Sequence, residues 1–152
     1  MIVELVDAIR NVLPHDGIVV DETATEPYKV LPGRLYVWPD RIGAQQLNIE
    51  AEQEGFFEDS TLRVRILYTV ANLGEQRTKT ARREVSLQLD ELATEAIAAL
   101  WRSRSHPFWW HVIIEQVRPD VVRALDCRGV GLNVAFKLTE EATRARLGGS
   151  GS

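Results

Sequence analysis

Residues 60–70, STLRVRILYTV, place apolar side chains on one side of the chain and mostly polar side chains on the other. The apolar side carries Leu62, Val64, Ile66, Tyr68 and Val70. This period of two is typical of a strand with one buried face, because successive side chains of a strand point to opposite faces. Residues 129–138, GVGLNVAFKL, repeat the pattern. Two such strands predict a sheet on which the rest of the chain packs.

Two other stretches, residues 2–13 and 85–103, space their apolar residues three and four apart, as amphipathic helices do. Shorter strands are expected at residues 18–20, 35–38 and 112–117. Residues 121–125 fit either a strand or a turn of helix. The order helix, strands, long helix, strands predicts an α+β fold. We expect a mainly antiparallel sheet with an N-terminal helix and one long amphipathic helix packed on one face.

The strongest strand and the strongest helix should bury their apolar faces against each other. We expect the apolar side of residues 60–70 to meet the helix through Leu92, Ala96, Ile97 and Leu100. The adjacent Trp109 and Trp110 suit either an interaction hot spot or the core. The core is favoured, because large aromatic side chains dominate protein cores as well as interfaces.

The chain has 152 residues, enough for one domain with its own core, which we expect at residues 1–139. We expect residues 140–147 to form a frayed C-terminal segment and residues 148–152, GGSGS, to be a flexible linker or tag remnant. A net charge of −4 argues against a general affinity for nucleic acid or for anionic membranes. No apolar run reaches the roughly 20 residues of a membrane span, and the sequence predicts a protein made in the cytoplasm.

Few residues carry the chemistry of a catalytic or metal site. The histidines His15, His106 and His111 lack the spacing of zinc ligands, and a turn-capping or solvated role is expected for the first two. Cys127 is the single cysteine, so an internal disulfide is excluded, and a half-buried place in a turn at residues 126–129 is expected for it. The Gly-Val-Gly that opens the closing strand indicates a bulge or bend. We therefore expect neither enzymatic activity nor a cofactor or metal.

Two segments of opposite charge flank the central strand, an acidic one at residues 50–59 and a basic one that follows a turn at residues 72–74. The basic segment is expected to be a loop. The candidate interface residues in the two segments are Glu50, Glu52, Glu54, Glu58, Arg77, Lys79, Arg82 and Arg83. Complementary patches on one subunit suit a head-to-tail contact between copies, since they favour one docking register. Two unrelated solvated segments explain the pattern equally well.

The order and character of these elements resemble the tail-terminator family of long-tailed bacteriophages, the minor tail protein U type. The resemblance covers most of residues 1–139. It rests on the amphipathic start IVELVDAIRNVL, the strand RLYVWP, the central FFEDSTLRVRILYTV, the single long helix and the closing GVGLNVAFKL. It implies a small α+β domain with no catalytic site and no cofactor.

The resemblance further implies a virion protein of the phage tail, assembled in the host cytoplasm as a homo-oligomeric ring, typically of six copies. Such a ring caps the tail tube, ends its polymerisation and joins it to the head. The partners would be the tail-tube protein and a head-tail connector or neck protein, with DNA only passing through the channel and no membrane. The alternatives are a head-closure or neck adaptor, a tail-tube subunit and, from another class, a small nucleic-acid-binding domain that uses the basic segment.

Overall fold

The computed structural model describes residues 2–40, 61–71, 79–123 and 127–142. Within these residues, two helices and five strands follow one another as α1 (Ile2–Val12), β1 (Val19–Val20), β2 (Arg34–Pro39), β3 (Thr61–Ala71), α4 (Lys79–Arg102), β4 (Trp109–Arg123) and β5 (Cys127–Leu138). The strands form one sheet in the order β1-β2-β3-β5-β4, in which β1 and β2 are parallel and the other neighbours antiparallel. The predicted α+β fold is therefore confirmed.

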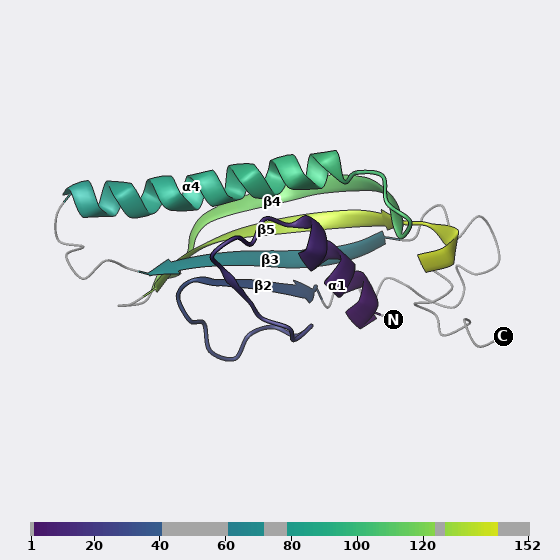
Figure 1. Ribbon diagram of the computed structural model, residues 1–152, viewed down its shortest axis with the longest axis horizontal. Coiled ribbons are helices and arrows are strands. Elements are labelled where there is room, and N and C mark those ends of the chain that lie inside the picture. The colour runs from purple at the N-terminus through teal and green to yellow at the C-terminus, as the bar shows by residue number, and fades with distance from the viewer. Residues whose placement is uncertain (1, 41–60, 72–78, 124–126, 143–152) are drawn as a thin grey trace.

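The two strands with the clearest alternation, β3 and β5, are direct neighbours at the centre of the sheet (Figure 1). Their register places Ile66 opposite Leu132 and Val64 opposite Val134, so the apolar sides of both strands share one face. All four of these side chains are buried. The matched alternation on the two strands fixes this pairing, because a slip by one residue would turn every apolar side chain toward the other face.

Both helices cover this apolar face and form one core with it (Figure 1). α4 contributes the buried Val85, Leu89, Ala93, Ala96 and Leu100, and α1 contributes Leu5, Val6, Ile9 and Leu13. The predicted contact between residues 60–70 and the long helix is thus confirmed, although Leu92 and Ile97 lie at its margin and are only partly buried.

α4 begins six residues before the first apolar residue of its periodic pattern, at Lys79. The prediction that residues 77–83 form a loop is wrong from residue 79 onward, because Lys, Ala, Arg and Glu are good helix formers even without a core contact. Val85 is the first described side chain of α4 that reaches the core.

β4 is longer and less regular than expected. It runs through Pro119, and its register against β5 shifts between Trp109 and His111, between Ile114 and Gln116, and between Arg118 and Val122. Residues 121–123, which fit a strand or a helical turn by sequence, belong to the strand. The bulge signal of Gly129 and Gly131 is explained by the last shift, which lies opposite them on β4. The turn expected at residues 126–129 is wrong for its last three positions, since β5 begins at Cys127.

Two buried residues of β3, Tyr68 and Thr69, use their hydroxyl groups to hold neighbouring segments of the chain. The Tyr68 hydroxyl donates to the Pro14 carbonyl at 2.7 Å, which fixes the end of α1. The Thr69 hydroxyl donates to the Leu31 carbonyl at 2.6 Å and accepts from the Arg34 amide at 3.0 Å, which fixes the turn before β2. Beyond β5, Ala142 lies in the segment expected to be frayed, yet it is buried in the core.

Candidate functional site

Most of the predicted interface lies outside the described residues. This holds for Glu50, Glu52, Glu54, Glu58 and Arg77. The backbone of Lys79 opens α4, and the side chains of Arg82 and Arg83 are exposed on its first turns. The two predicted segments therefore cannot be compared as one surface. Their complementarity stays a prediction.

Local structure accounts for His15, His106 and Cys127, and His111 is exposed on β4. His15 is exposed, with Nδ1 2.7 Å from the Leu13 carbonyl. His106 accepts a hydrogen bond at Nδ1 from the Phe108 amide at 3.0 Å and stacks on Trp109, with ring centroids 3.9 Å apart. Burial lowers the pKa of His106.

Cys127 is fully buried in β5 rather than half-buried in a turn. Burial, and secondarily the charge of Glu95, raises the pKa of Tyr68 far above its ordinary value, so this hydroxyl stays a donor to Pro14. Among the described residues, no group of three or more His, Cys, Asp and Glu side chains is placed to hold a metal ion.

The sheet face away from the helices carries a ladder of polar pairs. Its members are Arg63 with Glu115 at 3.1 Å, Arg65 with Asp40 at 3.6 Å, Asn133 with Gln116 at 3.1 Å and Lys137 with Thr61 at 2.9 Å. Asn133–Gln116 and Lys137–Thr61 join neighbouring strands, whereas Arg63–Glu115 reaches across β5. The exposed ion pairs contribute up to about 1 kcal/mol each. Arg63 and Arg65 each face a carboxylate, whereas Lys137 pairs with the Thr61 hydroxyl. Arg118 also lies on this face.

A trough runs over the same face, between the β1–β2 connection and the sheet. It consists of two hollows of about 670 and 270 Å³ that share Glu26, Trp38 and Arg65. The Nε atom of Arg65 is buried there without a hydrogen-bond partner, 3.6 Å from the Asp40 carboxylate. The rest of the Arg65 side chain is more than a third exposed. The trough is open and of mixed polarity, which distinguishes it from a closed, mostly apolar small-molecule pocket.

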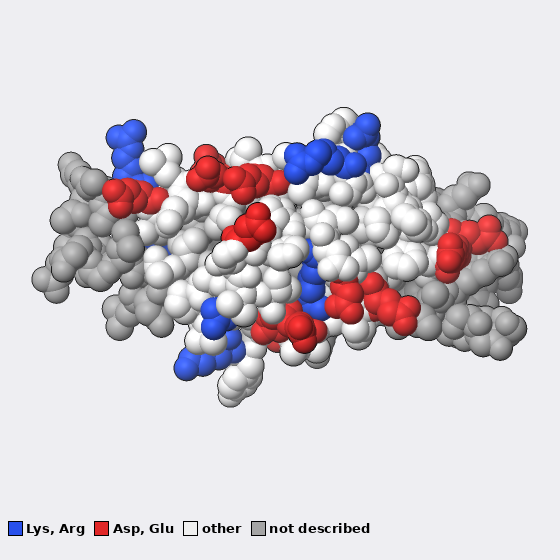
Figure 2. Space-filling view, in the orientation of Figure 1, with Lys and Arg blue, Asp and Glu red and all other residues white. Residues whose placement is uncertain are grey.

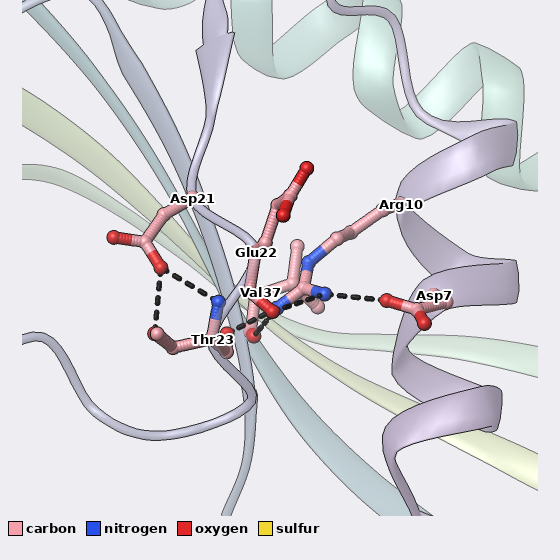
Figure 3. A network of polar contacts seen from close by, with 6 residues as sticks. All are labelled: Asp7, Arg10, Asp21, Glu22, Thr23 and Val37. Carbon is pink, nitrogen blue, oxygen red and sulfur yellow. Dashed lines mark hydrogen bonds and ion pairs between the residues drawn. The ribbon is translucent and has the colours of Figure 1, made fainter.

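Arg10 is the most buried charged side chain among the described residues, 5% exposed, and it joins α1 to the neighbouring loop and strand. Figure 3 shows its guanidinium extending from α1 toward the backbone of residues 22–23 and β2. It donates to the Asp7 carboxylate at 2.6 Å, to the Glu22 and Val37 carbonyls at 3.1 and 3.3 Å, and to the Thr23 carbonyl. Asp21 closes the turn by accepting from the Thr23 amide. The two terminal nitrogens of Arg10 donate to the chain itself, which gives the network a structural purpose, while its Nε atom is buried without a hydrogen-bond partner.

The two edges of the sheet expose large apolar side chains. On β4 these are Trp110, Ile113 and Val117, and at the other edge it is Val19 of β1. Tyr28 and Leu31, which are also exposed, lie in the β1–β2 connection. Trp109, by contrast, is fully buried, with its ring against Phe136 and its Nε1 donating to the Ser103 carbonyl at 2.7 Å. Trp109 is therefore part of the core, whereas Trp110 is available to a partner.

Of the exposed edge residues, only Trp110 was considered from the sequence, as one of two tryptophans that suit a hot spot or the core. Arg10 was not identified, although a signal for it exists. Pro119 inside a β-branched run indicates an edge strand, because proline has no N–H group to donate to a neighbouring strand. Arg10 lies one turn after Val6 and three residues before Leu13, on the face that the apolar spacing marks as buried.

Comparisons of this chain with protein-family models, with curated proteins and with solved structures found no match. No helix among the described residues has the length and apolar character needed to cross a membrane.

Proposed function

We propose that this chain is a tail terminator of a long-tailed bacteriophage, a structural protein that closes into a ring on the end of the tail tube. The ring stops tube polymerisation and presents its other side to the head-tail connector. The proposal includes no catalytic step and no cofactor. A head-closure or neck adaptor of the same virion is the alternative that shares the same support.

The observation that carries the proposal is a small sheet domain with large apolar side chains exposed on both of its edges. Trp110 is 53% exposed on β4, and Val19 is 56% exposed at the far edge. Exposed apolar side chains at two separate places on one subunit offer surface to other subunits. Head-to-tail contacts between unlike surfaces close into a ring when the rotation allows it.

The fold also fits the resemblance from which the proposal comes. The RLYVWP stretch is β2, the central stretch contains β3, and GVGLNVAFKL lies in β5. A nucleic-acid-binding role is less favoured. The net charge is −4, and two arginines of the helix-free face, Arg63 and Arg65, face Glu115 and Asp40.

The experiment is polymerisation of the cognate tail-tube protein with and without this chain, followed by tube-length measurement on electron micrographs. A terminator shortens the tubes at substoichiometric amounts and co-sediments with them in proportion to the number of ends. A tube subunit would co-sediment in proportion to tube length instead. Unchanged lengths together with a salt-dependent shift of DNA mobility would replace the proposal with the nucleic-acid role.

The absence of catalytic and metal chemistry is tested separately. Replacing His15, His106, His111 and Cys127 one at a time should leave tube capping intact wherever the variant folds. Stoichiometric zinc in the purified protein, measured by elemental analysis, would contradict this part of the proposal.

A further inference from the structure

We propose that the trough on the helix-free face of the sheet binds an extended peptide of another protein, with an acidic side chain of that peptide at one end and a basic side chain at the other. The trough is the pair of hollows between the β1–β2 connection and the sheet. The inference goes beyond the proposed function and does not depend on it, because it rests on the lining of the trough alone.

The floor of the trough crosses four strands of the sheet. Trp38 of β2 is opposite Arg65 of β3, which is in turn opposite Asn133 of β5. Arg118 of β4 is opposite Gly131 of β5, and all five residues line the smaller hollow. Neighbouring strands lie about 4.8 Å apart, so the three spacings from β2 to β4 span about 14 Å. An extended peptide covers this distance with about five residues.

Charge is distributed unevenly along the trough. Among the described residues that line it, the smaller hollow has two guanidinium groups, from Arg65 and Arg118, and one carboxylate, from Glu26. The larger hollow has the carboxylates of Glu26 and Asp40 and the guanidinium of Arg65. One end therefore favours an anionic group and the other a cationic group, which gives a bound peptide its direction.

This pattern matches a peptide better than a nucleic acid. A phosphate backbone carries the same sign of charge along its whole length, so the carboxylate end of the trough would repel it. On the face of the molecule that Figure 2 shows, the described basic side chains are likewise separated by acidic ones. A peptide can carry both signs of charge within a few residues.

Two of the charged groups in the trough have no partner within the described part of the chain. Neither the Arg118 guanidinium nor the Glu26 carboxylate makes a hydrogen bond or an ion pair there. They belong to different walls of the smaller hollow, β4 and the β1–β2 connection, so a ligand between them can contact both. A guanidinium binds a carboxylate through two parallel hydrogen bonds, which are stronger than bonds between neutral groups.

The β1–β2 connection offers free backbone groups along the trough. The Arg10 guanidinium binds the carbonyls of residues 22–23, and the Tyr36 hydroxyl accepts from the Leu31 amide at 2.9 Å. Between these two fixed points, residues 24–28 make no hydrogen bond to any described residue. Their backbone groups can therefore pair with the backbone of a bound peptide, and main-chain hydrogen bonds of this kind supply affinity in extended-peptide recognition.

The test selects peptides from a phage-displayed library of random heptapeptides, with the wild-type chain as bait and an excess of the R118E variant as soluble competitor. The enriched peptides should combine an Asp or Glu with a Lys or Arg. One of them, labelled with fluorescein, is then titrated by fluorescence anisotropy. Its affinity should fall about tenfold or more in Arg118→Gln and in Glu26→Gln, because each variant removes one charge-assisted contact. The matched controls Arg102→Gln and Glu84→Gln, both exposed on α4, should bind as the wild type does.

Two further measurements separate direct contact from an effect on folding. The R118E variant should prefer a version of the peptide in which Lys replaces the acidic residue. In the wild type, the peptide should shift the indole N–H resonance of Trp38 and leave that of Trp101, which is exposed on α4, unchanged. A library in which no peptide distinguishes the wild type from R118E would overturn the inference. Equal affinity of Arg118→Gln, or a Trp38 resonance that does not move, would overturn it as well.

The inference and the proposed function fail separately. A chain that caps tubes but selects no such peptide would keep the function and lose the peptide site. A chain that binds the peptide through Arg118 and Glu26 but leaves tubes growing would keep the peptide site and lose the function.

Discussion

Val121 of β4 lies over Gly131 of β5, with its Cγ1 atom 3.3 Å from the position that a Cβ on residue 131 would occupy. Gly131 is opposite Arg118, next to the last register shift of β4. The missing side chain of Gly131 is therefore what gives Val121 its place over the sheet. A glycine in a strand interior often marks such a close approach.

The first prediction follows from this contact. Gly131→Ala should lower the free energy of unfolding by about 1 kcal/mol, the low end of the range for overpacking, because Val121 must move only slightly to admit the methyl group. In the Gly131→Ala/Val121→Ala double variant the loss should be smaller than the sum of the two single losses, because the crowding is removed. Urea denaturation of the four proteins measures the coupling. Strict additivity would show that the two residues do not meet.

The second prediction concerns the central core. Ile66 is 1% exposed and lies opposite Leu132, beneath the helices. Ile66→Ala should cost about 2–5 kcal/mol, whereas Leu87→Ala on the exposed side of α4 should stay within about 0.5 kcal/mol. A shared urea midpoint for the two variants would contradict the assigned faces of β3 and α4.

The third prediction concerns Arg10. Arg10→Leu removes the donor from the Glu22, Thr23 and Val37 carbonyls and should cost about 1.5–3 kcal/mol, the range for hydrogen bonds to charged groups. Arg10→Lys should recover only part of this, because one ammonium cannot reproduce the planar fork. Hydrogen exchange should quicken at residues 21–24 in both variants. Exchange rates at residues 21–24 that equal the wild-type rates in both variants would show that other contacts hold this loop.

The fourth prediction is a pH dependence. Burial lowers the pKa of folded His106 below its unfolded value of about 6.5, and Nδ1 is occupied as an acceptor from the Phe108 amide. The unfolded chain then binds more protons as the pH falls below that value, so this contribution to stability is complete above it and is lost on acidification. The urea midpoint should fall less between pH 7.5 and pH 5 in His106→Gln than in the wild type. If the urea midpoints of the wild type and the variant fall by the same amount over this pH range, His106 is not the cause of the pH dependence.

The central sheet could be predicted because β3 and β5 repeat a strict period of two, which both defines a strand and sets its register. The start of α4 could not be predicted, because Ala81 is the single apolar residue among residues 79–84 and one residue makes no periodic pattern. The extent of β4 was missed for a related reason, since Pro119 and the register shifts interrupt its alternation.

The candidate surface illustrates a different limit. Runs of charge are visible in a sequence, and they led to residues 50–59 and 77–83 as the interface. Exposed apolar residues are not visible in this way, because Trp109 and Trp110 are identical in type and only the bulge after Trp109 separates their environments. Which side of a strand stays uncovered depends on the packing of the whole chain.

Electron microscopy of tail tubes polymerised from the cognate tube protein in the presence of this chain tests the terminator role most directly. We expect extra density with the shape of a closed ring at one end of each tube, and native mass spectrometry of the released ring should give a whole-number multiple of 17.2 kDa. Tubes with two bare ends, or with this chain distributed along their length, would contradict it.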